Sequence, residues 1–152
     1  MLYVHAQDEE CFYQCEPMLG HFEIGMTGYI QGVPVCAEYC DAWFNACKGD
    51  TTCAENWLED FDFAADGTNT CPNNSQCVTF QEMYGSSQGL CNRMWGSAFY
   101  YETNTANCTV MHFNSSQPNP NFQLTFPSGA PVVELFTSLL LLWVGLAMLV
   151  IL

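Results

Sequence analysis

The stretch VPVCAEYCDAWFNACKG, residues 33–49, combines three cysteines with the signals that begin and end a helix. Pro34 suits a first helical turn, because its missing N–H is not needed there, and Gly49 after Lys48 suits the stop. Spacings of four, three and four residues then place four side chains on one helix face: Cys36, Cys40, Trp43 and Cys47. Cysteines on a buried helix face are positioned to tie the helix to other elements. The stretch therefore predicts a helix at the centre of a disulfide-bonded domain.

The whole chain carries ten cysteines in 152 residues, which is a high and even number. This load is typical of a disulfide scaffold that forms in an oxidising compartment. A zinc site is the alternative, but no C-x-x-C pair occurs and the three histidines are scattered, so no metal site is predicted: His5, His21 and His112. Three acceptor triplets for N-glycosylation agree with a secretory route: Asn73, Asn107 and Asn114.

Charge and motifs limit the function classes. The formal net charge is −14, with Lys48 and Arg93 as the basic residues, so phosphate backbones are repelled and nucleic acid is not an expected partner. The chain lacks G-x-S-x-G, H-E-x-x-H and glycine-rich phosphate-loop motifs. The acidic residues 59–69 fail the calcium-loop template, because Ala64 and Ala65 replace a ligand and the required glycine. We expect a binding protein without a cofactor, not an enzyme.

Two other stretches carry helix signals. TCAENWLEDF opens with the capping-box pair Thr52 and Glu55. The stretch SSQGLCNRMWGSAFYY, residues 86–101, places three residues on one face at spacings of four: Cys91, Trp95 and Phe99. Strand patterns are sparse and comprise CVTF and CTVMHF, residues 77–80 and 108–113. The expected fold is mainly α with short β-strands and many loops.

The C-terminal part differs in composition from the cysteine-rich part. Residues 114–131 are rich in Asn, Ser and Pro, which predicts an extended stalk. Residues 132–152 end in an apolar run with no basic residue after it, and the small residues Ser128 and Gly129 precede them. This layout is typical of a GPI-attachment signal, with Ser128 as the attachment site, and an ordinary transmembrane helix is the alternative.

The N-terminal part, MLYVHAQDEE, has no basic start and no apolar h-region, so it is not a signal peptide. Because glycosylation and a GPI anchor both require export, we expect the native chain to start upstream of Met1.

Aromatic side chains cluster beside the cysteines and on the predicted helix faces. Trp43 is expected in the core. The others favour a cleft with opposed aromatic walls, which would bind a flat heterocycle by offset stacking and would be held rigid by disulfides. They are Tyr13, Trp57, Trp95, Phe61 and Phe63.

The ordered cysteines and the tryptophans between them resemble the folate receptor and riboflavin-binding protein family. Five stretches carry the resemblance: ECFYQCEP (10–17), the continuous run over 33–61, CVTFQEMY (77–84), LCNRMWGSAF (90–99) and QPNPN (117–121). The resemblance covers residues 9–121 and implies a compact, mainly helical, disulfide-rich domain there, followed by the stalk and the apolar C-terminal segment.

The resemblance also implies a disulfide pattern, with Cys36 bonded to Cys108, Cys40 to Cys91, and Cys53 to Cys71. Four other cysteines match family members whose partners lie further upstream, and are expected to be partnerless or mispaired: Cys11, Cys15, Cys47 and Cys77. Together with the missing signal peptide, this pattern indicates that the chain lacks the N-terminal portion of the family. Residues 1–10 would then be the start of the truncated region.

Ligand-binding residues are implied by the same resemblance. The family stacks its vitamin ring between a tyrosine and a tryptophan, and Tyr13 and Trp95 occupy those positions. Glu9, with Asp8 beside it, stands where a folate receptor has the aspartate that holds the pterin edge. Further aromatic candidates for the site are Phe61, Phe63 and Phe99.

Other contacts of the folate branch are missing. The segment 20–36 is short and has no basic residue, Glu59 and Asp60 lie where that branch has a lysine, and Ala98 replaces a serine. Because folate carries two carboxylates and riboflavin is neutral, these changes favour riboflavin. The GPI-like tail favours folate instead, since the resemblance implies that such anchors belong to the folate branch.

The expected function is that of a cell-surface receptor, on the extracellular side of the plasma membrane, that binds riboflavin or folate for uptake. The alternative is an adhesion or recognition protein with a protein partner and a degenerate pocket on the same scaffold. The egg receptor for sperm, a member of the family, looks like such a case.

Overall fold

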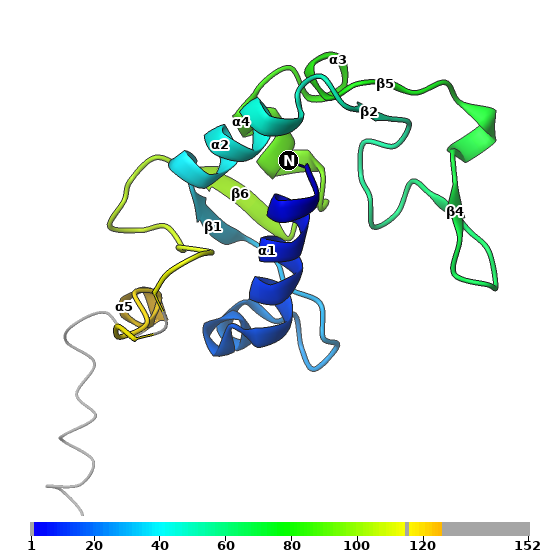
Figure 1. The fold of residues 1–152 in the computed structure, drawn as a ribbon. Helices are drawn as coiled ribbons and strands as arrows, with labels where there is room; N and C mark the ends of the chain where they lie inside the picture. The colour runs from blue at the N-terminus through cyan, green and yellow to red at the C-terminus, as the bar shows by residue number, and fades with distance from the viewer. Residues whose placement is uncertain (1, 115, 126–152) are drawn as a thin grey trace, which may run out of the picture.

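The structure is a computed structural model that describes residues 2–114 and 116–125 (Figure 1). Short helices and two- to four-residue strands alternate along the chain. The helical elements are α1 (Leu2–Cys15), η1 (Pro17–Phe22), α2 (Ala37–Cys47), η2 (Pro72–Asn74), α3 (Phe80–Tyr84), α4 (Ser87–Arg93) and α5 (Phe122–Thr125). The strands are β1 (Val33–Cys36), β2 (Thr51–Thr52), β3 (Asp62–Phe63), β4 (Asn69–Thr70), β5 (Val78–Thr79) and β6 (Phe99–Glu102). The predicted class, helices with short strands in a small disulfide-rich domain, is confirmed.

The strands form three two-stranded sheets. β1 and β6 pair in parallel, with Val33 opposite Phe99 and Cys36 opposite Glu102, and β1 also bridges to Thr109. The other sheets are antiparallel pairs, β2 with β5 and β3 with β4. Helices α2 and α4 lie beside the β1–β6 pair, whereas the hairpin of β3 and β4 extends away from them (Figure 1).

The cysteine-bearing helix forms as α2, but it begins after the proline and not with it. Pro34 lies in β1, where its carbonyl accepts hydrogen bonds from the backbone and side chain of Thr109. Extended backbone suits this position, because proline supplies no N–H and restricts the residue before it to extended conformations. The prediction of a first helical turn at Pro34 is therefore wrong. Cys40, Trp43 and Cys47 are buried on one helix face, as predicted, whereas Cys36, predicted on the same face, is the last residue of β1 and precedes the helix.

Two neighbouring clusters of buried side chains form the core. The first surrounds β1 and comprises Phe12, Leu19, Val33, Val35, Cys40, Cys91, Ala98, Phe99 and Met111. The second surrounds the C-terminal half of α2 and comprises Trp43, Phe44, Cys47, Phe80, Tyr84, Leu90 and Met94. Trp43 is 2% exposed, so its assignment to the core is confirmed. Tyr39 and Trp95 pack against both clusters and join them.

The helix predicted over residues 52–61 does not form: Thr52 ends β2, and bends and turns follow it. The Thr52 hydroxyl bonds to the backbone of Ala54 and makes no cap with Glu55. The Asp60 carboxylate accepts hydrogen bonds from the backbone N–H of Glu55 and of Asn56, which closes a turn. A side chain from five residues further on thus satisfies the donors that a helix start would leave unpaired.

A capping box does form at the start of α3. The Thr79 hydroxyl accepts a hydrogen bond from the backbone N–H of Glu82, and the Glu82 carboxylate accepts one from the backbone N–H of Thr79. Both distances are short, 3.1 and 2.9 Å. The sequence pattern TFQE therefore begins the helix that the pattern at residues 52–55 does not.

The helix predicted over residues 86–101 is shorter in the structure. α4 ends at Arg93, and Phe99 belongs to β6 and not to the helix face of Cys91 and Trp95. Of the two predicted strands, residues 77–80 contribute β5, whereas residues 108–113 form only the isolated bridge at Thr109.

Part of the predicted stalk is described by the structure. Asn119 and Asn121 both donate hydrogen bonds to the carboxylate of Glu16 at distances of 2.9–3.0 Å. These bonds hold residues 119–121 against the start of η1. Ser128 and residues 132–152, predicted as the anchor, lie outside the described residues. Among the residues that the structure describes, no helix is long and apolar enough to cross a membrane.

Candidate binding pocket and the comparisons with known proteins

Three disulfides hold the domain together, and they are the pairs that the resemblance implies: Cys36–Cys108, Cys40–Cys91 and Cys53–Cys71. The second bond joins α2 directly to α4. Their sequence separations are 72, 51 and 18 residues. In a loop-closure model, bonds of this span each stabilise the fold by about 3–4.5 kcal/mol. The frame around the pocket is thus covalently restrained.

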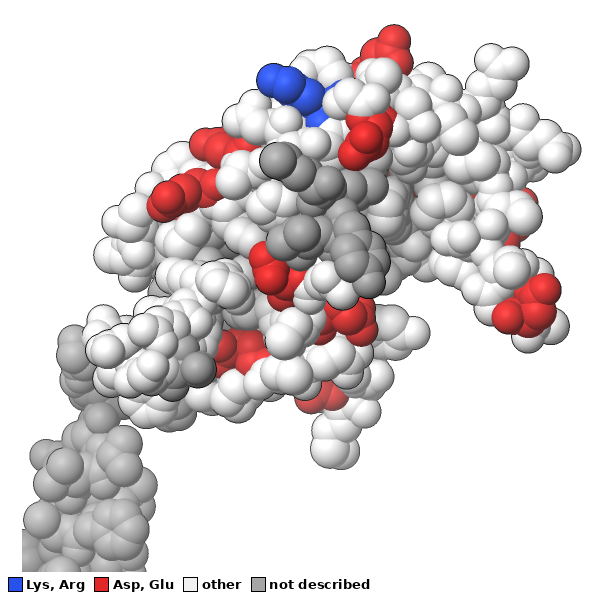
Figure 2. Space-filling model, viewed as in Figure 1, with Lys and Arg blue, Asp and Glu red and all other residues white. Residues whose placement is uncertain are grey.

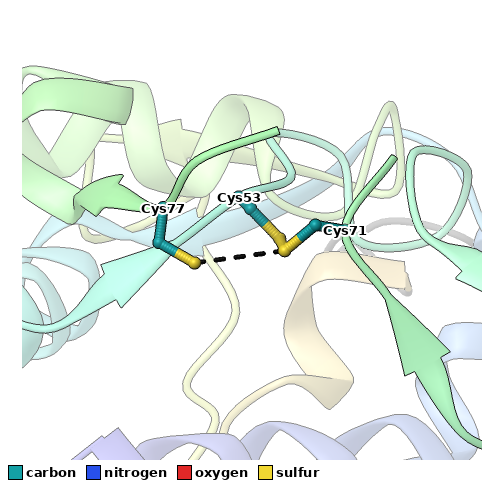
Figure 3. Close-up of side chains that lie close together, drawn as sticks. All are labelled: Cys53, Cys71 and Cys77. Atoms are coloured by element: carbon teal, nitrogen blue, oxygen red, sulfur yellow. Dashed lines mark hydrogen bonds between the residues drawn. A yellow bond between two sulfur atoms is a disulfide. The ribbon is translucent and has the colours of Figure 1, made fainter. Parts of the chain in front are cut away.

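Four cysteines carry thiols in the structure: Cys11, Cys15, Cys47 and Cys77. Cys47 is buried, whereas the other three are exposed. Figure 3 shows that the Cys77 sulfur points toward the Cys53–Cys71 disulfide, and its Sγ lies 4.0 Å from Cys71 Sγ. These three sulfurs form the one set of three clustered metal-ligand atoms found within residues 2–114 and 116–125. Because two of them are bonded to each other, the set cannot supply three thiolate ligands.

The pocket that gathers predicted ligand residues lies between α1 and the segment that joins α4 to β6. It is a cavity of about 150 Å³ that opens to solvent. Its predominantly apolar wall includes four aromatic side chains. The lining residues are Glu9, Glu10, Tyr13, Tyr29, Leu58, Trp95, Ala98 and Phe99. A concave apolar site with a few polar groups is the usual form of a small-molecule pocket.

Helix α1 supplies one wall. Glu9 and Tyr13 are four residues apart and therefore lie on the same helix face. Phe12 is buried in the first core cluster, and the Tyr39 hydroxyl of α2 donates a hydrogen bond of 2.9 Å to the backbone carbonyl of His5. These contacts dock α1 on the domain. The Tyr13 hydroxyl donates to the carbonyl of Gly28 at 2.8 Å, which sets the direction of its ring.

The opposite wall begins with Trp95, two residues after the end of α4. Its ring meets Trp57 edge to face, with ring centroids 5.9 Å apart. Because Trp95 packs against both core clusters, its ring is held in place from the side away from the pocket. Phe99, the first residue of β6, is also buried in the core and lines the pocket.

Glu9 is the most buried polar residue of the pocket lining, at 5% exposure. Burial, with a smaller effect of the neighbouring Glu10, raises the pKa of Glu9 from 4.5 to about 7. Its carboxyl forms no hydrogen bond or ion pair with other residues of the described chain. A buried carboxyl without a partner is unfavourable in the charged form, and donors on a ligand would relieve that cost.

Four of the seven predicted ligand residues line this pocket and three do not. Glu9, Tyr13, Trp95 and Phe99 come together there. The ring of Phe61 packs edge to face on Trp57 and on Phe63, both outside the pocket, and Phe63 is 61% exposed on β3. Asp8 faces His112, with 3.8 Å between Asp8 Oδ1 and His112 Nδ1.

Sequence reasoning missed Tyr29, Leu58 and Glu10 as lining residues. Tyr29 lies in the segment 20–36, which the sequence comparison singled out only because it lacks ligand contacts of the folate branch. No motif marks the tyrosine itself. Leu58 lies in a stretch that we predicted to be helical. Glu10 is adjacent to Glu9, so a helix-face argument from Glu9 and Tyr13 would include it.

The charge around the pocket is acidic. The pocket lining contains two glutamates and no basic residue. Arg93 pairs with Glu55 and donates to the carbonyl of Tyr84, so its charge is used elsewhere. Figure 2 shows acidic side chains in separate patches across the visible face, with the basic ones near its upper edge. An anionic ligand group would therefore meet repulsion at the mouth.

The three predicted glycosylation acceptors are all on the surface. Asn73, Asn107 and Asn114 are exposed, and Asn73 has a positive φ of 52° at a tight bend. Thr109, which completes the triplet of Asn107, is buried and bonded to β1. Glycan addition at Asn107 would therefore have to precede folding of this segment.

The fold and the pocket define a small, disulfide-stabilised domain with a concave aromatic site that is open to solvent. The sequence model of the folate receptor family matches residues 4–112. The chain belongs to the folate receptor family, as the resemblance indicates.

Individual relatives agree with this assignment. The chain is 38% identical over 104 residues to the riboflavin-binding protein of Dromaius novaehollandiae, a match that covers 68% of this chain and 43% of the relative. It is 39% identical, with the same coverage, to the riboflavin-binding protein of Gallus gallus. It is 31% identical over 125 residues to folate receptor gamma of Homo sapiens, covering 77% of this chain and 51% of the relative. The chain thus spans about half the length of the curated relatives it matches.

Proposed function

We propose that this domain binds a flat heterocyclic vitamin, with the ring held between Tyr13 and Trp95, and that it acts by binding and not by catalysis. The observation that carries the proposal is that Glu9 and Tyr13 of α1 and Trp95, which is distant from them in the sequence, line one apolar pocket. The relatives named above include riboflavin-binding proteins and folate receptors.

The chemistry of the three side chains suits a nitrogen heterocycle. Aromatic rings stack on flat π-systems with an offset, and each such pair contributes about 0.5–1.5 kcal/mol beyond the burial of its area. Glu9 offers carboxyl oxygens to the N–H edge of the ring. Because the carboxyl is buried, a hydrogen bond to it is stronger than one made in water.

Riboflavin is the ligand that the charge pattern favours over folate. Its ring system and ribityl chain are neutral, whereas the glutamate tail of folate would approach Glu9 and Glu10 without a basic residue in the pocket lining. Like charges across a binding site cost several kcal/mol. The higher identity to riboflavin-binding proteins, 38–39% against 31%, supports the same choice.

The proposed location is the cell surface, on the extracellular side of the plasma membrane. Three disulfides support an oxidising compartment. The apolar residues 132–152 would anchor the chain, either after GPI attachment at Ser128 or as a single membrane span, and the captured vitamin would be delivered by uptake.

One observation favours an adhesion or recognition function as the second candidate. Ile24, Met26 and Tyr29 are large apolar residues exposed on one loop beside the pocket. An exposed apolar patch of this kind is a common feature of protein-binding surfaces.

The test is a titration of the purified full chain with riboflavin, followed by quenching of flavin fluorescence, and with folic acid, followed by tryptophan fluorescence. Trp95→Ala should abolish saturable binding, whereas Tyr100→Ala, a change at an exposed ring of β6 outside the pocket, should leave it intact. Absence of wild-type binding at micromolar concentrations of both vitamins would overturn vitamin binding. Partner capture that survives Trp95→Ala would support the second candidate.

A further inference from the structure

The loop between η1 and β1 is well ordered by its own hydrogen bonds. We call residues 23–32 the rim loop. Within it Glu23 and Ile30 form an antiparallel bridge, and the backbone N–H of Ile24 donates to the carbonyl of Tyr29 at 2.8 Å. The loop turns at Gly25 and Gly28, whose φ values of 66° and 79° are in the region that favours glycine.

The rim loop is attached to both walls of the pocket. On the α1 side, the Tyr13 hydroxyl donates to the Gly28 carbonyl at 2.8 Å; within the loop, the Gly28 N–H donates to the Glu23 carboxylate at 2.7 Å. On the Trp95 side, the N–H of Gly32 donates to the Ser97 carbonyl at 2.9 Å. The loop therefore bridges the mouth of the pocket.

Tyr29 is the rim-loop side chain that lines the pocket, and 68% of it is exposed. Neither core cluster includes it, so core packing does not account for an aromatic residue at this position. Met26 on the same loop is fully exposed and does not line the pocket, which makes it a matched control.

We propose that Tyr29 is a third aromatic contact to the ligand and that the rim loop acts through Tyr13 as a positioning element; this inference rests on the proposed function. Because the Tyr13 hydroxyl donates its hydrogen bond to Gly28 of the loop, the loop sets the angle of the ring that stacks on the ligand. Through the same hydrogen bond, Tyr13 holds Tyr29 over the mouth. The two tyrosines therefore act as a coupled pair on a flat, uncharged heterocycle.

The test measures riboflavin affinity of the full chain by quenching of flavin fluorescence. Tyr29→Ala should raise the Kd about 3- to 10-fold, the range expected for one aromatic pair, whereas Tyr29→Phe and Met26→Ala should stay within about twofold. Because Tyr29 is exposed, its replacement should leave the thermal unfolding midpoint unchanged. An unchanged Kd in Tyr29→Ala would overturn the contact.

A double-mutant cycle tests the coupling, since a purely structural role of Tyr13 would not make the two changes interdependent. Tyr13→Phe keeps the ring and removes the hydrogen bond to Gly28. In the Tyr13→Phe background, Tyr29→Ala should raise the Kd by only about twofold, less than in the wild type, because the loop has already lost its hydrogen bond to Tyr13. Strict additivity would overturn the positioning role.

The same titrations separate the two levels of the argument. Wild-type binding with an unchanged Tyr29→Ala variant overturns this inference alone. Wild-type chain that fails to bind riboflavin and folic acid overturns the proposed function, and this inference with it.

Discussion

Replacing Glu9 with Gln should make the protein more stable at neutral pH and leave it unchanged in acid. Burial raises the pKa of this carboxyl from 4.5 to about 7, so between these values the unfolded chain has released a proton that the folded chain retains. Stability then falls as the pH rises, because the folded state binds more protons than the unfolded state. The full cost is reached above pH 7 and amounts to about 3 kcal/mol. Glutamine occupies nearly the same volume and cannot ionise, so the Glu9→Gln variant avoids the cost of a buried charge.

The assay is urea unfolding of the wild type and Glu9→Gln at pH 4.5, 6, 7 and 8, with the disulfides intact. The gain in unfolding free energy should grow from about zero at pH 4.5 to about 3 kcal/mol at pH 8. Glu38→Gln, a change at an exposed carboxylate of α2, serves as the control and should show no such growth. A gain for Glu9→Gln that is the same at every pH would refute the reasoning.

The same substitution should have the opposite effect on ligand binding. A heterocycle that donates N–H groups prefers the ionised carboxylate, so riboflavin affinity of the wild type should rise as the pH rises toward 7 and level off above it. Glu9→Gln should bind about 10- to 100-fold more weakly at pH 8, the range for a hydrogen bond to a charged group, and lose this pH dependence. Equal affinity and equal pH profiles would show that Glu9 does not contact the ligand.

Three further predictions concern the frame around the pocket. In the native protein a maleimide should label the exposed Cys77 and spare Cys47, whose burial raises its pKa to about 11; peptide mapping by mass spectrometry checks this, and labelling of Cys47 at the same rate would contradict it. Asn121→Ala should lower the unfolding free energy by about 2–4 kcal/mol in urea, because this 1%-exposed amide makes hydrogen bonds that would be left unpaired. Replacing both Cys40 and Cys91 by Ala should cost about 4 kcal/mol by the same assay, and a loss below 1 kcal/mol would contradict a loop-closure contribution.

The central helix was predictable because its signal is local and repeated. In α2 the spacing of Cys40, Trp43 and Cys47 marks one face, and all three are buried as the spacing requires. Its starting point was not predictable in the same way. Pro34 has the backbone preferences of both a first helical turn and an extended strand, and pairing of β1 with β6 selects the strand. That pairing joins residues far apart in sequence, so no short-range pattern reports it.

The two capping-box patterns show how far local chemistry can be trusted. Thr52 with Glu55 and Thr79 with Glu82 have the same spacing, yet only the second pair caps a helix. Near Thr52, the backbone N–H groups of Glu55 and Asn56 donate to the carboxylate of Asp60 instead. The sequence shows that Asp60 is a possible competing acceptor, but it does not show the turn geometry that brings its carboxylate to these N–H groups.

The pocket illustrates the same division between local and distant information. Glu9 and Tyr13 share a helix face, and that relation follows from their spacing alone. Their meeting with Trp95 depends on how α1 docks against α2 and α4, and it was expected only because the family places a tyrosine and a tryptophan there. Tyr29 enters from a loop whose position is set by hydrogen bonds to Tyr13 and Ser97.

Aromatic content by itself was a poor guide to the site. Phe61 and Phe63 lie near the other rings in sequence, but Phe61 packs on Trp57, which does not line the pocket, and Phe63 is exposed on β3. The pocket instead uses rings that are fixed from behind by the core, as Trp95 and Phe99 are. A stacking wall must be immobile before the ligand arrives, because ordering it on binding would consume part of the affinity. Rigidity supplied by the core and the disulfides, more than the number of aromatic residues, therefore decides which of them can serve as walls.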